Sequence, residues 1–214
     1  MTRRRLTRAE SQAQTRERLL EAARRSFARH GYDGASIDAI AEEAGYSKGA
    51  IYSNFHGKEE LFLELMRQHM ADEVRDIDAV LTELSGSKAK PDKVTSTLMV
   101  WLQNLNTDAD WSMLGVELLL HARRNPTFTT KYDALDAQHR ATLGVLIARL
   151  FAAMDKALPA EAEVIASAMM ALAHGLALRR TKPLSRGGGD PAGTLMQLVL
   201  QSLIAVAPER GKAR

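Results

Sequence analysis

The stretch of sequence that decides the fold spans residues 36–55 and runs SIDAIAEEAGYSKGAIYSNF. Apolar residues recur at helical spacing on both sides of Gly45, and Ser36 and Ser47 are each suited to cap the start of a helix. Glycine at position 45 allows the chain to turn sharply between the two segments. The pattern predicts two helices of about eight or nine residues joined by a tight turn, which is the arrangement of a helix-turn-helix unit.

The second of these helices has the side chains expected of a DNA-reading helix. Ile51 and Phe55 lie four residues apart and should face the core, which leaves small or hydrogen-bonding side chains on the other face. In a helix-turn-helix unit this helix enters the major groove, and helix N-termini with their serines can hold phosphates. We predict DNA contacts from Ser36, Ser47, Lys48, Gly49, Ala50, Tyr52, Ser53 and Asn54. The pattern by itself also fits an ordinary pair of short helices in a helical protein.

The segment before this unit is basic. Its first thirty residues contain nine arginines and three glutamates. An apolar helical period begins at Thr15 and stops at Gly31, so we predict a flexible basic arm over residues 1–14 followed by the first helix. The arm either stays solvated or places the three arginines at positions 3–5 in a minor groove.

The longer stretch from residue 15 to 66 resembles the DNA-binding domain of the TetR family of helix-turn-helix transcriptional regulators almost end to end. The strongest matches are Phe27, Gly31, Tyr32, Ile40, Ala41, Ala44, Gly45, Ser47, Lys48, Gly49, Ile51, Tyr52, Phe55, Lys58, Glu59, Glu60 and Leu61. The resemblance implies that Tyr52 contacts a backbone phosphate and that Lys58, at the start of the next helix, touches phosphate as well.

The chain also departs from the family pattern in this stretch. Tyr46 stands where the family more often has valine, and Gly57 stands where it usually has serine. Ser53 and Asn54 replace a bulkier pair of side chains. These departures leave the predicted fold unchanged, but the base preference stays open.

The rest of the chain also has helical spacing and no strand pattern. With the three helices above, the expected total is nine, the later ones spanning residues 57–85, 91–105, 109–124, 127–155, 160–180 and 191–206. We predict an all-α, TetR-like architecture: a DNA-binding domain over residues 15–57 and an effector-binding and dimerisation domain over 58–214. The uncharged, apolar-rich stretch over residues 164–178 has 15 residues, too short to span a membrane, and the chain has no cysteine. We therefore expect a cytoplasmic protein without membrane association, metal or cofactor.

The last two expected helices are broadly apolar, so they need cover on most sides. The resemblance implies that they form a four-helix bundle with a second copy of the chain. The interface is predicted at Ile165, Met169, Leu172, Leu176, Leu195, Val199 and Leu203. Burial within one protomer is the alternative. A two-fold dimer would bind a pseudo-palindromic DNA operator.

The resemblance also implies an effector site among the middle helices. The candidate lining residues are Trp101, Met113, His121, Phe128, Tyr132, Phe151, Met170 and His174. Large, soft side chains of this kind suit a small hydrophobic or aromatic ligand, although each of them also suits a packed core. Trp111 is interpreted as a packing residue instead.

Taken with the resemblance, these features imply a ligand-responsive repressor whose small-molecule effector moves the DNA-binding heads through the long fourth helix. An activator, or a regulator controlled by a protein partner, is the alternative. An enzyme is disfavoured, because the sequence has no Walker loop, HExxH or GxGxxG motif and aligns no catalytic residues. A non-specific DNA-coating protein is disfavoured as well, because residues 58–214 carry 19 basic and 19 acidic side chains.

Overall fold

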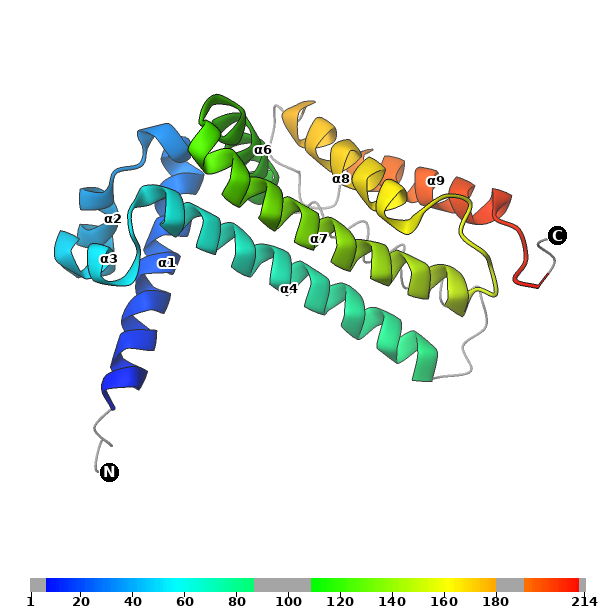
Figure 1. Ribbon diagram of the computed structural model, residues 1–214, viewed down its shortest axis with the longest axis horizontal. Coiled ribbons are helices and arrows are strands. Elements are labelled where there is room, and N and C mark those ends of the chain that lie inside the picture. The colour runs from blue at the N-terminus through cyan, green and yellow to red at the C-terminus, as the bar shows by residue number, and fades with distance from the viewer. Residues whose placement is uncertain (1–6, 87–108, 180–190, 212–214) are drawn as a thin grey trace.

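The computed structural model describes residues 7–86, 109–179 and 191–211. Within these residues the chain forms helices and no strand, so the predicted all-α class is confirmed (Figure 1). The helices are α1 Arg8–Gly34, α2 Ile37–Ala44, α3 Lys48–Asn54, α4 Lys58–Gly86, α6 Ala109–Arg124, α7 Pro126–Ala153, α8 Ala162–Arg179 and α9 Pro191–Val206. The helix expected over residues 91–105 lies outside the described residues.

The first helix begins earlier than the sequence analysis predicted. Thr7 caps it: the Thr7 hydroxyl accepts from the Glu10 N–H at 3.2 Å, and the Glu10 carboxylate accepts from the Thr7 N–H at 2.7 Å. This reciprocal pair is a capping box, which starts a helix without an apolar face. The prediction of a flexible arm was therefore wrong for residues 8–14, while residues 1–6 lie outside the described part.

The first three helices, α1 to α3, form an N-terminal head that does not have a core of its own. Phe27 of α1, Ile40 of α2 and Ile51 of α3 are buried in a cluster that continues into α4, α6 and α7. Phe62 of α4 is fully buried in the same cluster, and its ring lies 4.7 Å from that of Phe27. The head is therefore packed as one body with the start of α4.

The remaining helices form an elongated bundle in which α4 and α7 run beside each other and α8 and α9 lie on the far side from the head (Figure 1). A second core joins them around Leu146, Leu150 and Phe151 of α7 and Met196 and Leu200 of α9. No helix in the described part of the chain is long and apolar enough to cross a membrane.

Candidate DNA interface and ligand cavity

The turn between α2 and α3 has the geometry that the sequence predicted. Ser36 caps α2, its hydroxyl accepting from the Ala39 N–H at 3.1 Å. Gly45 ends α2 with a φ of 75°, in the left-handed region that glycine adopts without strain. Ser47 occupies the cap position of α3, but its side chain makes no capping hydrogen bond, contrary to expectation.

The face of α3 that points away from the core carries most of the predicted DNA contacts. Ile51 and Phe55 are buried, as predicted, so the opposite side of the helix is free for a partner. Lys48, Gly49 and Ser53 are exposed, and Tyr52 is 53% exposed. Ala50 and Asn54, which were also predicted, are half-buried.

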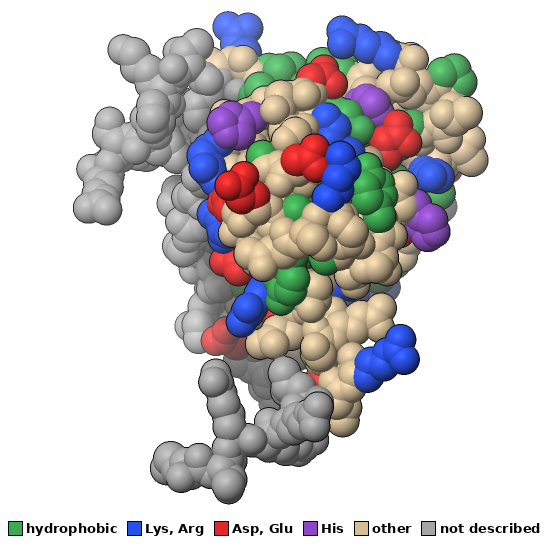
Figure 2. Space-filling view, turned by 90° about the vertical axis from the view of Figure 1, so that its left-hand side faces the viewer, with side chains coloured by type: hydrophobic (Ala, Val, Ile, Leu, Met, Phe, Trp, Pro, Cys, Tyr) green, Lys and Arg blue, Asp and Glu red, His purple; other side chains and the backbone are tan. Residues whose placement is uncertain are grey.

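Lys48 has an ion-pair partner on the neighbouring helix. Its ammonium lies 3.0 Å from the Asp38 carboxylate in the first turn of α2, and this hydrogen bond raises the pKa of Lys48 above its ordinary value. Figure 2 looks onto this end of the molecule and shows acidic side chains interspersed with the lysines and arginines. Lys48 can therefore contact a phosphate only if its ammonium leaves Asp38 or binds Asp38 and the phosphate at the same time.

Asn54 is held at the end of α3. Its side-chain amide donates to the Ala50 carbonyl at 2.8 Å, and the Arg16 guanidinium of α1 donates to the Asn54 carbonyl at 2.8 Å. Arg16 also lies over the Phe55 ring, 4.2 Å from its centre. This arrangement secures the end of α3 on α1, so it disfavours base reading by Asn54, which stays an untested prediction.

Lys58 also occupies a structural position. Its ammonium donates to the carbonyls of Tyr32 at 2.8 Å and Ala35 at 3.1 Å, where the chain leaves α1, and lies 4.5 Å from the centre of the Tyr32 ring. The contact with phosphate that the family resemblance implies would compete with these bonds. It stays a prediction that this geometry disfavours.

We expect Lys58→Met to lower the free energy of unfolding by about 1–3 kcal/mol, because partly buried carbonyls lose a charged donor. Urea unfolding followed by circular dichroism measures the change. Lys48→Met is the matched control, and it should leave the unfolding midpoint nearly unchanged because its ammonium is exposed. A Lys58→Met protein of unchanged stability but weakened DNA binding would show that Lys58 serves the DNA.

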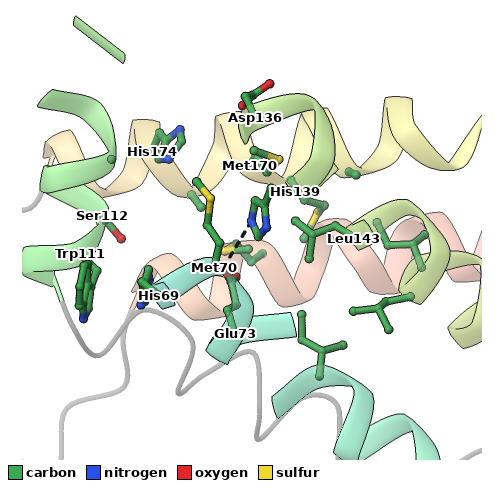
Figure 3. A pocket seen from close by; sticks show the side chains of 18 of the residues that line it. His69, Met70, Glu73, Trp111, Ser112, Asp136, His139, Leu143, Met170 and His174 are labelled. Atoms are coloured by element: carbon green, nitrogen blue, oxygen red, sulfur yellow. Dashed lines mark ion pairs between the residues drawn. The ribbon is translucent and has the colours of Figure 1, made fainter. Parts of the chain in front are cut away.

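A cavity of about 200 Å³ lies between α4, α6, α7, α8 and α9 (Figure 3). Of the residues predicted to line an effector pocket, Tyr132, Met170 and His174 line it. The others do not: Met113 is 38% exposed, Phe151 is fully buried in the second core, and His121 and Phe128 pack together at the junction with the head. Trp101 lies outside the described residues.

Several polar residues of the cavity were missed by the sequence analysis. They are His69 and Glu73 of α4, Ser112 of α6, and Asp136 and His139 of α7. Trp111, interpreted as a packing residue, lines the cavity and stacks on His69 with 4.1 Å between ring centres. The available signal was a set of polar side chains at helical spacing among the apolar residues of the fourth helix.

Burial controls the charge of these groups. It raises the pKa of Glu73 to about 7, an effect increased by the nearby negative charge of Asp76, and it lowers the pKa of His139 to about 4. Burial lowers the pKa of His174 as well. The His139 Nε2 lies 3.5 Å from the Glu73 Oε2, a contact drawn as a dashed line in Figure 3. At neutral pH His139 and His174 are therefore neutral, and the carboxyl group of Glu73 is close to half ionisation.

Comparison with known proteins places the helix-turn-helix in its family. Residues 19–65 match the family described as "Bacterial regulatory proteins, tetR family". Residues 19–65 are thus a TetR-family segment. It is 32% identical over 120 residues to the HTH-type transcriptional repressor AcnR of Corynebacterium glutamicum, a stretch that covers 55% of this chain and 56% of that repressor. The match thus spans little more than half the length of this relative.

Solved structures of TetR-like regulators share the complete fold. A TetR-family transcriptional regulator from Mesorhizobium loti has a TM-score of 0.70 and 19% identity, covering 94% of this chain and 99% of its own. FadR from Bacillus subtilis, solved in complex with stearoyl-CoA, has a TM-score of 0.64 and 16% identity, covering 88% of this chain and 97% of its own. At these identities the likeness shows the fold.

Helix α6 joins the cavity to the head. Gly115 of α6 lines the cavity, and one half-turn further along, the Glu117 carboxylate accepts from the Tyr32 N–H at 2.5 Å. Gly31, with a φ of 68°, brings the backbone so close that an added Cβ would lie 3.0 Å from the Glu117 carboxylate. Another turn on, the His121 ring packs 4.4 Å from Tyr32 and its Nε2 lies 3.1 Å from Glu59 of α4.

The predicted dimer residues point mostly inward within one protomer. Ile165 is 3% exposed and Met169 lines the cavity, while Leu172, Leu176 and Leu203 pack on the second core. Val199 is half-buried, and Leu195, at 40% exposure, does face outward.

The outward side of the same two helices is apolar as well. On α8 its exposed residues recur at alternating steps of four and three, the period of a helix-packing seam, at Val164, Ala168, Ala171, Gly175 and Leu178. Leu198 and Val206 of α9 are 53% and 72% exposed. Dimerisation through α8 and α9 therefore stays a prediction. The interface residues that we predicted on α8, however, belong to the inner face of that helix.

Proposed function

We propose that the protein is a ligand-responsive transcriptional repressor that binds a pseudo-palindromic DNA operator as a homodimer and leaves it when a small effector binds. In this proposal residues 15–57 read the DNA, residues 58–214 bind the effector and dimerise, and the protein is cytoplasmic. The match of residues 19–65 to a family of bacterial regulators and the similarity to a named repressor support this role.

One observation carries the link between effector and DNA: α6 both lines the cavity and holds the head. Ser112 and Gly115 face the cavity, whereas Glu117 on the same helix bonds the backbone of Tyr32. A ligand that binds better when α6 is displaced would bias the head toward a second position, as any allosteric effector must. The effector need not touch the DNA-reading helix.

A second contribution comes from α4, which begins in the head and ends beyond the cavity. Phe62 near its start is part of the head core, while Glu73 and Ile77 line the cavity. Movement of α4 would therefore carry the head with it. The proposal assigns the transmission to α4 and α6 together, rather than to the fourth helix alone.

Dimerisation is proposed through the outward side of α8 and α9. An exposed apolar seam on α8 beside the exposed Leu198 of α9 offers a self-complementary surface of the kind that two-fold dimers use. The paired heads would then meet half-sites on one side of the duplex, about 34–36 Å apart or a multiple of that distance.

The test begins with selection of bound fragments from a bacterial genomic library, followed by a compound screen for release of the selected DNA. We expect a two-fold-symmetric sequence bound at least ~1,000-fold more tightly than random DNA at matched salt. Equal affinity for random DNA would contradict the proposal.

The proposed transmission from the cavity to the head can be tested with a variant at Glu117. Glu117→Ala should leave effector affinity for the cavity unchanged but weaken effector-driven release of DNA, because it removes the bond to the Tyr32 N–H. Asp72→Ala removes an exposed carboxylate of α4 that pairs with Arg75 on the same helix and lies outside the cavity lining, so it serves as the control and should not alter release. Full release from the Glu117→Ala protein would exclude this contact from the mechanism.

A further inference from the structure

The cavity contains acidic groups without a fixed positive charge to match them all. Among the described residues that line it there is no lysine or arginine, and its carboxylates are those of Glu73 and Asp136. Asp136 has its own cation, because the Arg140 guanidinium lies 2.5 Å from it, one turn along α7. Glu73 has none: within the described part of the chain, the ion-pair neighbour of its carboxylate is the His139 ring.

The described residues of the cavity lining place no lysine or arginine against Glu73. On α4 its neighbours are His69 and Asp76, on α7 Asp136 and His139, and on α8 His174. The described lining residues of α6 and α9 carry no acidic or basic side chain. His139 and His174 have lowered pKa values because they are buried, so neither supplies a positive charge near neutral pH.

The Glu73 carboxyl group also remains reachable from the cavity. Its side chain keeps 23% of its surface accessible, although burial raises its pKa to about 7. Glu73 is one of the residues that line the cavity. A buried carboxylate without a cation costs stability, and a ligand that brings the cation removes that cost.

We propose that the cavity takes a small organic cation, whose ammonium group binds against Glu73 while its apolar body lies among the surrounding methionine and leucine side chains. This inference rests on the proposed role of the cavity as the effector site. Met70, Met169 and Met170 offer polarisable thioethers, and Tyr132 offers an aromatic ring, all suited to a soft cation.

The size of the cavity sets a limit on the ligand. Its volume of about 200 Å³ is below the range of roughly 300–1,000 Å³ that is usual for drug-sized ligands. An anionic ligand is disfavoured, because the described lining provides no lysine, no arginine and no protonated His139 to receive it. A compact amine or quaternary ammonium compound with one apolar or aromatic group fits both the charge and the volume.

Benzyltrimethylammonium is a suitable probe, titrated calorimetrically into the full-length protein. Its matched comparisons are neopentylbenzene, which has the same shape without charge, and 3-phenylpropanoate, which carries the opposite charge. We expect the cation to bind at least about tenfold more tightly than either compound, about 1.4 kcal/mol. Equal or tighter binding of the neutral or anionic compound would overturn the proposal.

The pH dependence of the same titration tests Glu73 without any mutation. Benzyltrimethylammonium keeps its charge at every pH, so a change in affinity must come from the protein. With the pKa of Glu73 at about 7, its ionised fraction rises about tenfold between pH 6 and pH 8, and the affinity should rise by a similar factor. A flat or falling affinity over this range would contradict the role of Glu73.

Glu73→Gln should remove both the preference for the cation and its pH dependence, while the binding of neopentylbenzene changes little. Gln keeps the shape of the side chain and relieves the desolvation of a charge, so the fold should persist. Asp76→Asn is the matched control: it removes the same charge from an exposed position of α4 and should change cation affinity by less than about twofold. Unchanged cation binding in Glu73→Gln would refute the proposal.

The two proposals fail in different ways. Cation binding that depends on Glu73 but releases no operator DNA would refute the regulatory role and leave the ligand class standing. Release of operator DNA by a neutral or anionic compound, unaffected by Glu73→Gln, would refute the ligand class and leave the regulatory role standing.

Discussion

Gly49→Glu is expected to abolish operator binding while the protein stays folded. Gly49 is exposed on α3, and a Cβ at this position would meet only the Ser47 hydroxyl, at an ordinary contact distance of 3.6 Å. A carboxylate in the first turn of a helix also favours the helix itself. Against a DNA backbone the same charge is repulsive and prevents close approach, so we expect affinity to fall at least ~100-fold, about 3 kcal/mol.

Fluorescence anisotropy with the selected operator measures this loss, and urea unfolding measures stability. Gly49→Ala is the matched control, because it adds the Cβ without the charge. It should keep or raise the free energy of unfolding by up to about 1 kcal/mol and lose far less DNA affinity than Gly49→Glu. Operator binding by Gly49→Glu at the parental affinity would show that α3 does not face the DNA.

Leu198→Glu is expected to convert the proposed dimer into monomers and to reduce operator affinity by at least ~100-fold. Leu198 is 53% exposed on α9, beside the seam of α8, and two-fold symmetry places the new charge twice in one interface. The two carboxylates lose solvent and repel each other, and separate heads can no longer bind two half-sites together. Sedimentation velocity at micromolar concentration measures the association state.

Val145→Glu provides the comparison for this variant. Val145 is 60% exposed on α7, outside the two helices proposed to pair. Its replacement by glutamate introduces the same charge at an exposed apolar position. It should remain dimeric and bind operator normally. A dimeric Leu198→Glu protein, or a monomeric Val145→Glu protein, would place the interface elsewhere.

The helix-turn-helix could be predicted from sequence because its determinants are local. Ser36 and Gly45 specify the start and end of α2 by hydrogen bonding and by backbone conformation, without help from distant residues. The early start of α1 was equally readable in Thr7 and Glu10, but an analysis based on apolar spacing overlooks a helix turn that is wholly exposed.

The cavity was predicted only in part because it depends on how helices rotate against each other. Phe128 and Tyr132 lie one turn apart on α7, yet Phe128 packs at the head and Tyr132 lines the cavity. On α8 the adjacent residues Val164 and Ile165 face opposite ways, outward and inward. A helix that is apolar on most sides carries no periodic signal to say which side meets its own chain.

Lys58 illustrates a different limit. A basic residue at the start of a helix near the DNA-reading unit is compatible with a phosphate contact, and nothing in its neighbours along the chain argues otherwise. Its ammonium instead closes the end of α1, at carbonyls 23 and 26 residues earlier in the sequence. Such a contact is visible only once the tertiary structure brings α1 and α4 together.

The shared core of Phe27 and Phe62 has a consequence for modular exchange of the DNA-reading unit. A fragment cut at residue 57 would leave behind the side chains that complete its interior, among them Leu61 and Phe62. Transplanting the head onto another regulator therefore calls for a splice site inside α4, beyond Met66. The recipient must also supply side chains that replace Glu117 and His121 as the partners of Tyr32 and Glu59. In this protein the boundary between the head and the helices that enclose the cavity is a packed surface instead of a linker.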